Sequence, residues 1–324
     1  MAPQVSEFKP AWFLPGPHLQ TIWGRLVRPR RMAKLRREIV ETPDGDELVL
    51  DHLDGDASLR FILLHGLEGS ANSVYMQGLF AAIARRGFAA TAMHFRSCAL
   101  DAHGRALTNR RPRFYHSGET GDFDFVAHRL ATTPLAAIGA SLGGNVLLKW
   151  LGEHPDQQIV SAAAAFSVPF DLAAGARHIN HLYVARFLRS LKRKVIDLVT
   201  RFPEMRDVVD LPRTLRARNF VEFDDAATAP IHGFASADDY YARSSSMQFL
   251  PRIKTPTLIL NAEDDPFLPR EALERARAAA SPAVEFRTTK CGGHTGFIAG
   301  TVPWRCEYWA EEMIVEWLAA RAVK

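Results

Sequence analysis

Short apolar runs alternate along the chain with segments in which apolar residues recur at helical spacing. Near-continuous apolar runs of this kind are typical of strands that helices cover on both faces. Six segments are expected to be buried strands, at 61–65, 88–95, 134–140, 159–168, 255–262 and 283–288, and several of them are near-continuous apolar runs. Helical spacing follows at 73–87 and 142–155, and Pro155 ends the second segment because its ring cannot continue a helix. The alternation predicts an α/β fold with a mostly parallel central sheet and helices on both faces.

Two other segments break this alternation. Residues 36–52 resemble a hairpin, with a turn at 43–46. Residues 169–250 are too long for a structureless loop and contain a basic amphipathic stretch at 181–202, so we expect an inserted helical cap. The expected organisation is therefore a core of residues 36–168 and 251–324, a cap at 169–250, and an N-terminal arm, residues 1–35, that packs on the core or the cap.

The composition is that of a globular protein. Apolar residues make up 47% of the 324 residues and charged residues 23%. The net charge of +4 is too small to indicate a nucleic-acid partner. Basic residues gather near the N-terminus, where they form either a solvated surface segment or a contact with an anionic membrane surface. The residues concerned are Arg25, Arg28, Arg30, Arg31, Lys34, Arg36 and Arg37.

Cysteine usage and segment hydropathy bear on the compartment. The three cysteines are Cys98, Cys291 and Cys306. A small, odd number of cysteines does not indicate a disulfide framework, so a reducing environment is favoured. No charged segment followed by an apolar one marks a secretory signal, and no run of about 18 apolar residues could span a bilayer. We therefore expect a cytoplasmic protein; the sequence sets no oligomeric state.

A G-x-S-x-G pattern at 139–143 carries the clearest chemistry. It follows an apolar run and opens a helical segment, which is the context of a nucleophile elbow. A Cβ at Gly139 or Gly143 would clash with so tight a turn, and the helix N-terminus directs free N–H groups at the serine. We predict Ser141 as the nucleophile; the alternative is an ordinary glycine-rich strand–helix turn.

A serine hydroxyl is a weak nucleophile and needs a base. After a nucleophile elbow, the chain supplies first an acidic residue that orients the base and then the histidine that acts as the base. Of the twelve histidines, His294 alone lies past the last expected strand, and glycines on both sides let its loop fold back over the strand ends. The acid should end the strand at 255–262. We choose Asp265, because the D-P-x-x-P pattern places it at the turn, and keep Asp264 as the alternative.

The oxyanion formed in acyl transfer needs two N–H donors. One is expected from the backbone of Leu142, which follows the nucleophile, and the other from Leu67, in the loop after the strand at 61–65. Gly66 and Gly69 permit the bend that turns the Leu67 amide inward, although a routine strand–helix turn would also contain them. His178 and His181 would share a helix face but lack a third ligand, so we expect no metal and no cofactor.

Several segments together resemble the YheT-like (AB hydrolase 4) branch of the α/β-hydrolase superfamily, which includes ABHD1- and ABHD3-type lipid hydrolases and yeast medium-chain ester synthases. They are PHLQTIW (17–23), HGLEGS (65–70), YHSGET (115–120), GASLGGN (139–145), FDDAATAPIHGF (223–234), NAEDDPF (261–267) and GGHTGF (292–297). The resemblance covers nearly the whole chain. It implies an α/β-hydrolase fold and carboxylic ester hydrolysis on fatty-acyl esters, with the matching serine, aspartate and histidine as the catalytic triad. The stretch RSCAL (96–100) departs from the branch's glycine-containing turn, which bears on substrate preference.

The expected protein is a serine hydrolase that cleaves short- or medium-chain fatty-acyl esters through an acyl-enzyme. Its partner would be a small-molecule acyl ester. Two alternatives stay open: an acyltransferase that uses an alcohol acceptor with the same triad, and a non-catalytic lipid-binding protein that kept the fold.

Overall fold

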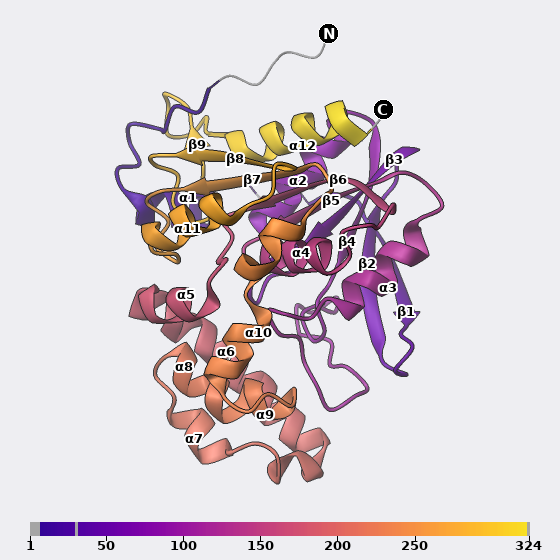
Figure 1. Ribbon diagram of the computed structural model, residues 1–324, viewed down its shortest axis with the longest axis vertical. Coiled ribbons are helices and arrows are strands. Elements are labelled where there is room, and N and C mark those ends of the chain that lie inside the picture. The colour runs from indigo at the N-terminus through magenta and orange to yellow at the C-terminus, as the bar shows by residue number, and fades with distance from the viewer. Residues whose placement is uncertain (1–6, 30–31, 323–324) are drawn as a thin grey trace.

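The computed structural model describes residues 7–29 and 32–322, and an eight-stranded sheet forms their centre (Figure 1). The strand order is β1-β2-β4-β3-β5-β6-β7-β8. β2 pairs antiparallel with β1 and with β4, and every other neighbouring pair is parallel. The bounds are β1 (Arg36–Glu41), β2 (Glu47–Leu53), β3 (Asp56–Leu64), β4 (Phe88–Met93), β5 (Leu135–Ala140), β6 (Val160–Phe166), β7 (Thr257–Ala262) and β8 (Val284–Thr289).

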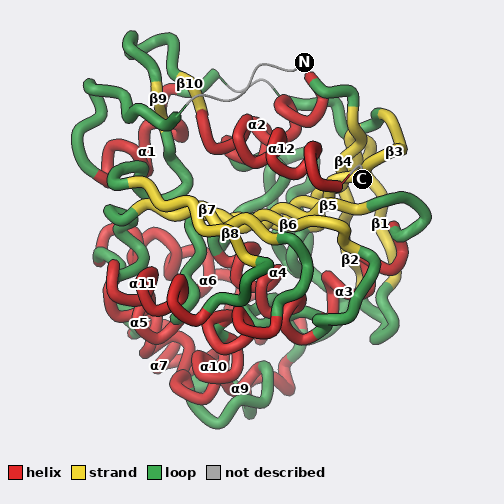
Figure 2. Tube along the Cα trace, turned by 45° about the horizontal axis from the view of Figure 1, so that its top comes forward, coloured by secondary structure: helices red, strands yellow, loops and turns green. Residues whose placement is uncertain are grey.

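Helices cover both faces of this sheet (Figure 2). α2 (Val74–Arg85) and α12 (Trp309–Ala322) pack on one face, and α3 (Gly121–Leu130), α4 (Leu142–Glu153) and α11 (Arg270–Ala279) pack on the other. Each face has its own apolar core, because successive side chains of a strand point to opposite faces. The mostly parallel sheet with two helical layers is therefore confirmed, and all six expected strands are present.

The chain between β6 and β7 folds into helices that gather beyond the carboxyl ends of the strands (Figure 1). We call this group, residues 172–244, the cap helices. They are α5 (Leu172–His178), α6 (His181–Arg201), the 3₁₀ turn η1 (Pro203–Arg206), α7 (Leu211–Arg216), α8 (Phe220–Phe223), the π-helix η2 (Asp224–Thr228), α9 (Ala229–Ile231) and α10 (Ala237–Ser244). A 3₁₀ segment, η3 (Ser246–Arg252), then packs on the core through Leu250.

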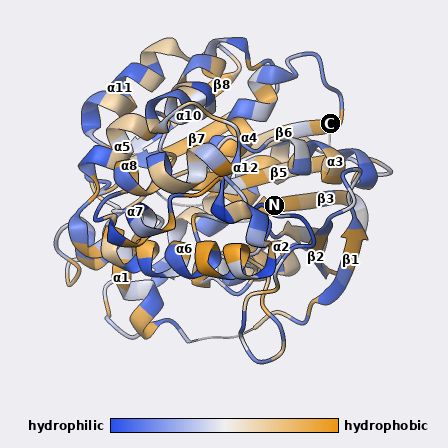
Figure 3. Ribbon diagram, turned by 90° about the horizontal axis from the view of Figure 1, so that it is seen from below, coloured by the Kyte–Doolittle hydropathy of each residue, from blue (hydrophilic) through white to orange (hydrophobic). Residues whose placement is uncertain are grey.

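α6 is the longest cap helix and is amphipathic. Val184, Leu188, Leu191, Val195 and Leu198 recur at intervals of three and four, which puts them on one face of a helix. These side chains are buried with residues of the shorter cap helices in a separate apolar cluster. Hydrophobic and hydrophilic segments accordingly alternate along α6 in Figure 3. Within the described residues, none of the helices combines the length and the apolar character needed to cross a membrane.

The N-terminal arm contains α1 (Pro17–Val27), which contacts both the core and a cap helix. The side-chain amide of Gln20 exchanges two hydrogen bonds with the backbone of Ile298, in the short strand β9 (Ile298–Ala299), which pairs with β10 (Glu307–Tyr308). On the other side, His18 Nδ1 lies 3.0 Å from the Tyr183 hydroxyl of α6.

The basic segment of the arm is partly neutralised. Arg28 forms a two-pronged ion pair with Glu311 of α12, and Arg37 forms one with Asp51 of β2. Arg25, Lys34 and Arg36 are exposed. Arg30 and Arg31 lie outside the described residues.

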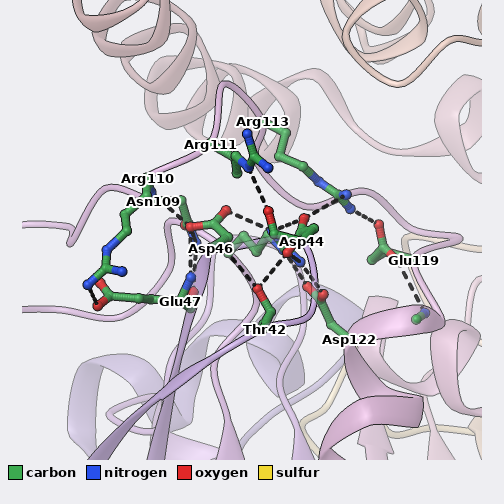
Figure 4. A network of polar contacts seen from close by, with 12 residues as sticks. Thr42, Asp44, Asp46, Glu47, Asn109, Arg110, Arg111, Arg113, Glu119 and Asp122 are labelled. Atoms are coloured by element: carbon green, nitrogen blue, oxygen red, sulfur yellow. Dashed lines mark hydrogen bonds and ion pairs between the residues drawn. The ribbon is translucent and has the colours of Figure 1, made fainter.

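The departure at 96–100 begins with a buried arginine, Arg96. Figure 4 shows the carboxylates that it contacts, those of Asp44, Asp46 and Asp122, close together. The Arg96 guanidinium donates to Asp46 at 2.7 Å and Asp44 at 2.9 Å, both in the turn between β1 and β2, and to Asp122 of α3 at 2.6 Å. Although burial opposes the charge, the bonds to Asp122 and Asp44 raise the pKa of Arg96. Asn109 also donates to Asp46, so the loop that follows β4 is fixed to the predicted hairpin turn.

Candidate active site

Ser141 lies on the turn between β5 and α4, near the middle of the sheet. Its backbone has φ 51° and ψ −119°, a conformation that L-residues rarely adopt. A Cβ at Gly139 would lie 2.5 Å from the Gly143 carbonyl oxygen, and one at Gly143 would lie 2.5 Å from the carbonyl oxygen of Leu64 in β3. Both glycines are therefore required, the first by the turn itself and the second by the neighbouring strand.

Parallel strands bring the remaining chemistry to the same edge. β5, β7 and β8 all end at one edge of the sheet, so the loops that follow them can meet there. His294 Nε2 lies 2.9 Å from Ser141 Oγ, and its Nδ1 lies 2.9 Å and 3.1 Å from the two carboxylate oxygens of Asp265. All three side chains are buried, with exposed fractions of 9% or less. They form one continuous line of hydrogen bonds.

The second carboxylate after β7 has a different partner. Asp264 Oδ1 accepts the backbone N–H of Gly293 at 2.9 Å, so it holds the loop that carries the histidine and does not contact the imidazole. Burial raises the pKa of Asp264, against the hydrogen bond from Gly293 that lowers it. It does not cap the next helix either, because α11 begins without a side-chain cap.

Two further contacts fix the imidazole and were not expected from the sequence. The Thr21 hydroxyl of α1 accepts the backbone N–H of His294 at 2.9 Å. The Phe267 ring stacks on the imidazole, with 3.9 Å between ring centroids and 12° between planes. Both residues lie in motifs shared with the YheT-like branch, but the letters alone do not show that position 21 reaches position 294.

The two residues expected to supply the oxyanion donors lie beside the serine. Leu67 and Leu142 both line the same cavity as Ser141. Across the described ranges, neither backbone N–H of these two residues donates a hydrogen bond to another protein group. The Leu67 loop is braced by the Tyr75 hydroxyl, which accepts the Gly66 N–H at 2.7 Å. Donors in this state are available to a substrate oxygen.

The cavity itself has a volume of about 800 Å³ and lies between the strand ends and the cap helices. Its wall is largely apolar, which suits an acyl chain. Besides Ser141, Leu67 and Leu142, the lining includes Leu172, Ile179, Phe187, Leu191, Phe220, Phe223 and Phe267.

Among residues 7–29 and 32–322, no group of three or more His, Cys, Asp or Glu side chains is arranged so that it could hold a metal ion. His178 ends α5 and His181 begins α6, so the helix face that we expected them to share does not exist. The break follows from Asn180, whose side chain accepts the Leu182 N–H and so caps a new helix.

Comparison with known proteins agrees with this fold. A family model described as the alpha/beta hydrolase fold matches residues 60–301. The chain belongs to the α/β-hydrolase family.

Its relatives narrow the assignment within that family. YheT of Escherichia coli (strain K12) is 37% identical over 97% of this chain and 93% of that protein. Phospholipase ABHD3 of Mus musculus is 31% identical over 89% of this chain and 72% of that protein. These likenesses place the chain in the YheT-like branch that its motifs indicated. The solved esterase EaEST from Exiguobacterium antarcticum shares the fold, with a TM-score of 0.55 and 16% identity over 88% of this chain and 100% of that chain.

Proposed function

We propose that this carboxylic ester hydrolase cleaves short- or medium-chain fatty-acyl esters, with Ser141 as nucleophile, His294 as base and Asp265 as the group that orients the base. The observation that carries the proposal is the unbroken hydrogen-bond line from Ser141 Oγ through the imidazole to the Asp265 carboxylate. Each gap is within the reach needed for proton transfer.

The reaction would run as acyl transfer. Ser141 Oγ attacks the ester carbonyl carbon while His294 Nε2 takes the hydroxyl proton, and Asp265 stabilises the imidazolium that forms. The amides of Leu67 and Leu142 receive the oxyanion, each lowering the barrier by roughly 3 kcal/mol. The imidazolium then gives its proton to the departing alcohol. Water, activated by the same imidazole, releases the acid from the acyl-enzyme.

The substrate class follows from the cavity wall and from the relatives. Apolar side chains of the core and of the cap helices surround Ser141, so the non-reacting part of the substrate is expected to be an acyl chain. Relatives named as a phospholipase and a monoacylglycerol lipase support esters of lipid type.

A series of p-nitrophenyl esters of increasing acyl length tests the proposal. Wild type should hydrolyse short or medium chains, and Ser141→Ala should lose on the order of 10⁶-fold in kcat because the nucleophile is absent. Ser58→Ala, an exposed serine at a distance from the site, should retain full activity. Equal rates in wild type and Ser141→Ala would refute the role of Ser141.

Two further outcomes of the same experiment are informative. If added ethanol at low concentration mainly yields an ethyl ester, the protein is an acyltransferase. A well-folded wild-type protein that neither hydrolyses esters nor reacts with a fluorophosphonate would be the non-catalytic lipid binder.

The exposed part of the basic segment supports a peripheral contact with an anionic membrane surface. Arg25 and Lys34 are exposed, and Leu26, which follows Arg25 in the chain, is 71% exposed. Cations next to an apolar side chain suit the interface of an anionic bilayer. Wild type should sediment with phosphatidylserine vesicles at low salt, and the double variant Arg25→Gln/Lys34→Gln should bind them less. Equal binding of both proteins would contradict this contact.

A further inference from the structure

One carboxylate interrupts the apolar wall of the cavity. Asp224 is the first residue of the π-helix η2 and lines the same cavity as Ser141. Its Oδ1 accepts the Thr228 hydroxyl at 2.6 Å, and its Oδ2 accepts the Tyr241 hydroxyl at 2.7 Å. Both donors are neutral. π-Helices are rare, and they occur frequently at functional sites.

No cation in the described ranges pairs with this carboxylate. The basic side chains of the neighbouring helices have other partners: Arg177 of α5 pairs with Asp238, and Arg213 of α7 pairs with Asp225. His116, which lines the cavity, has its pKa lowered by burial to about 3 and is therefore uncharged. A charge removed from water is ordinarily paired with another charge, so Asp224 has room for a partner from outside the chain.

The carboxyl group is ionised at neutral pH. Burial raises the pKa of Asp224 to about 6, against the hydrogen bonds from Thr228 and Tyr241 that lower it. A carboxylate offers about four lone-pair sites, and the two hydroxyls occupy one on each oxygen. Each oxygen therefore retains capacity for a further contact. The half-buried Asp224 keeps this capacity on the cavity wall.

Aromatic rings accompany the carboxylate on the same wall. Tyr240 and Tyr241 of α10 both line the cavity, with 5.2 Å between their ring centroids, and Phe223 lines it directly before Asp224. Aromatic faces attract ammonium groups through their quadrupole, and the attraction grows where water is excluded. The combination of an unpaired carboxylate with several rings favours a positively charged ligand group over a neutral hydroxyl, which would leave the carboxylate charge uncompensated.

We propose that Asp224, Tyr240 and Tyr241 form a cation subsite in the substrate cavity, which binds an ammonium group carried by the ester. This inference rests on the proposed function, because it takes the cavity beside Ser141 as the place where the ester binds. It narrows the substrates to acyl esters that carry a protonated amine or a quaternary ammonium group within reach of the reacting carbonyl.

The test compares two esters of the same shape that differ by one charge: hexanoylcholine and 3,3-dimethylbutyl hexanoate. Binding is measured by calorimetry on the Ser141→Ala protein, so that no turnover is needed. The charged ester should bind at least about tenfold more tightly, as expected for a desolvated carboxylate and aromatic contact. Adding Asp224→Asn should reduce this ratio to about one while the Kd of the neutral ester stays unchanged.

Asp225→Asn in the same Ser141→Ala background is the matched control. Asp225 is the adjacent residue, but its carboxylate pairs with Arg213 and accepts the Ala237 N–H, so the ratio should persist. A ratio near one in the parent protein, or a ratio that Asp224→Asn leaves intact, would overturn the proposal. Equal loss in the Asp224 and Asp225 variants would also overturn it, since that result would indicate a structural effect of the cap helices.

If Asp224→Asn does not fold, the parent protein decides the question. Because the Asp224 carboxylate takes up a proton as the pH falls through about 6, preference for the charged ester should be full at pH 8 and largely lost at pH 5. A preference that is unchanged over this range would refute the subsite. Both readouts are independent of catalysis: intact charge selectivity in a protein that hydrolyses nothing would overturn the proposed function and leave the subsite standing.

Discussion

Two adjacent carboxylates, Asp264 and Asp265, follow β7, and their contacts separate them. Asp265 bonds to the imidazole of His294, and Asp264 bonds to the backbone of Gly293 in the same loop. Of these two neighbouring residues, one therefore binds a side chain and the other binds a backbone amide. Turn chemistry alone favoured Asp265 but could not place the Gly293 amide, because that amide lies 29 positions away.

The two carboxylates should respond differently to the same substitution. Asp265→Asn should lower kcat by roughly 10⁴-fold, because an amide in place of the carboxylate favours the wrong tautomer of His294. Asp264→Asn should cost far less, since its amide oxygen can still accept the Gly293 N–H. Steady-state kinetics on an activated ester measures both. The reverse order of the two losses would assign the acid to Asp264.

A single cap helix, α6, contacts the loop that carries the Leu67 amide. Lys194 and Ser190 of α6 both donate to the Glu68 carboxylate, and the Glu68 backbone has φ 54°. The Tyr115 hydroxyl accepts the Glu68 N–H and bonds to its carboxylate. Burial opposes the charge of Lys194, but Cys98 and Glu68 raise its pKa. The position of α6 is therefore linked to the geometry of the proposed oxyanion donor next to Glu68.

A double-mutant cycle on Glu68 and Lys194 measures this link. Lys194→Met should destabilise the fold by about 3 kcal/mol and lower kcat, because it leaves the Glu68 carboxylate buried without its cation. Glu68→Gln in the same protein should recover part of both losses. Denaturant unfolding and ester hydrolysis provide the two readouts. Additive losses would show that the two side chains act independently.

Helices and strands were predictable where apolar residues recur at a regular spacing along the chain. Contacts between residues far apart in the sequence were not predictable. Five of the expected strands are buried on both faces, which requires mostly apolar side chains, whereas β8 lies at the sheet edge, is only half-buried and carries polar residues. β3 begins at Asp56, five residues before its apolar run, because Asp56 and Ser58 at this end of the strand are exposed and can be polar. The π-helix at Asp224 has no sequence signal of its own. The contact between Thr21 and His294 joins the two ends of the fold, and no local pattern encodes it.

The molecule as a whole depends on carboxylates that pair with arginines around the β1–β2 hairpin. Asp44 pairs with Arg96, and Asp51 pairs with Arg37 and His94. Burial works against ionisation in both, but hydrogen bonds, from Thr42 and Arg96 to Asp44 and from Arg37 and His94 to Asp51, outweigh it. They lower the pKa of Asp44 to about 2 and hold that of Asp51 well below its ordinary value. The hairpin, the loop after β4 and α3 are thus joined by charge.

Acid should therefore unfold the protein in a particular range. A carboxyl group whose pKa is lower in the folded state stabilises the fold above its unfolded pKa, near 3.8, and loses this contribution as the pH falls below that value. The urea midpoint should decline below about pH 4, and Asp51→Asn should flatten the decline. Parallel curves for wild type and Asp51→Asn would exclude Asp51 as a cause.

Thr21 and His294 stand 273 positions apart and share one hydrogen bond. The first helix contributes no reacting atom, yet a substitution there can alter turnover by shifting the imidazole. Among natural variants, substitutions in that helix would be selected for or against through their effect on the rate of catalysis. The arm and the histidine loop should therefore be inherited together, and transplanting one into a homologue without the other should impair the recipient.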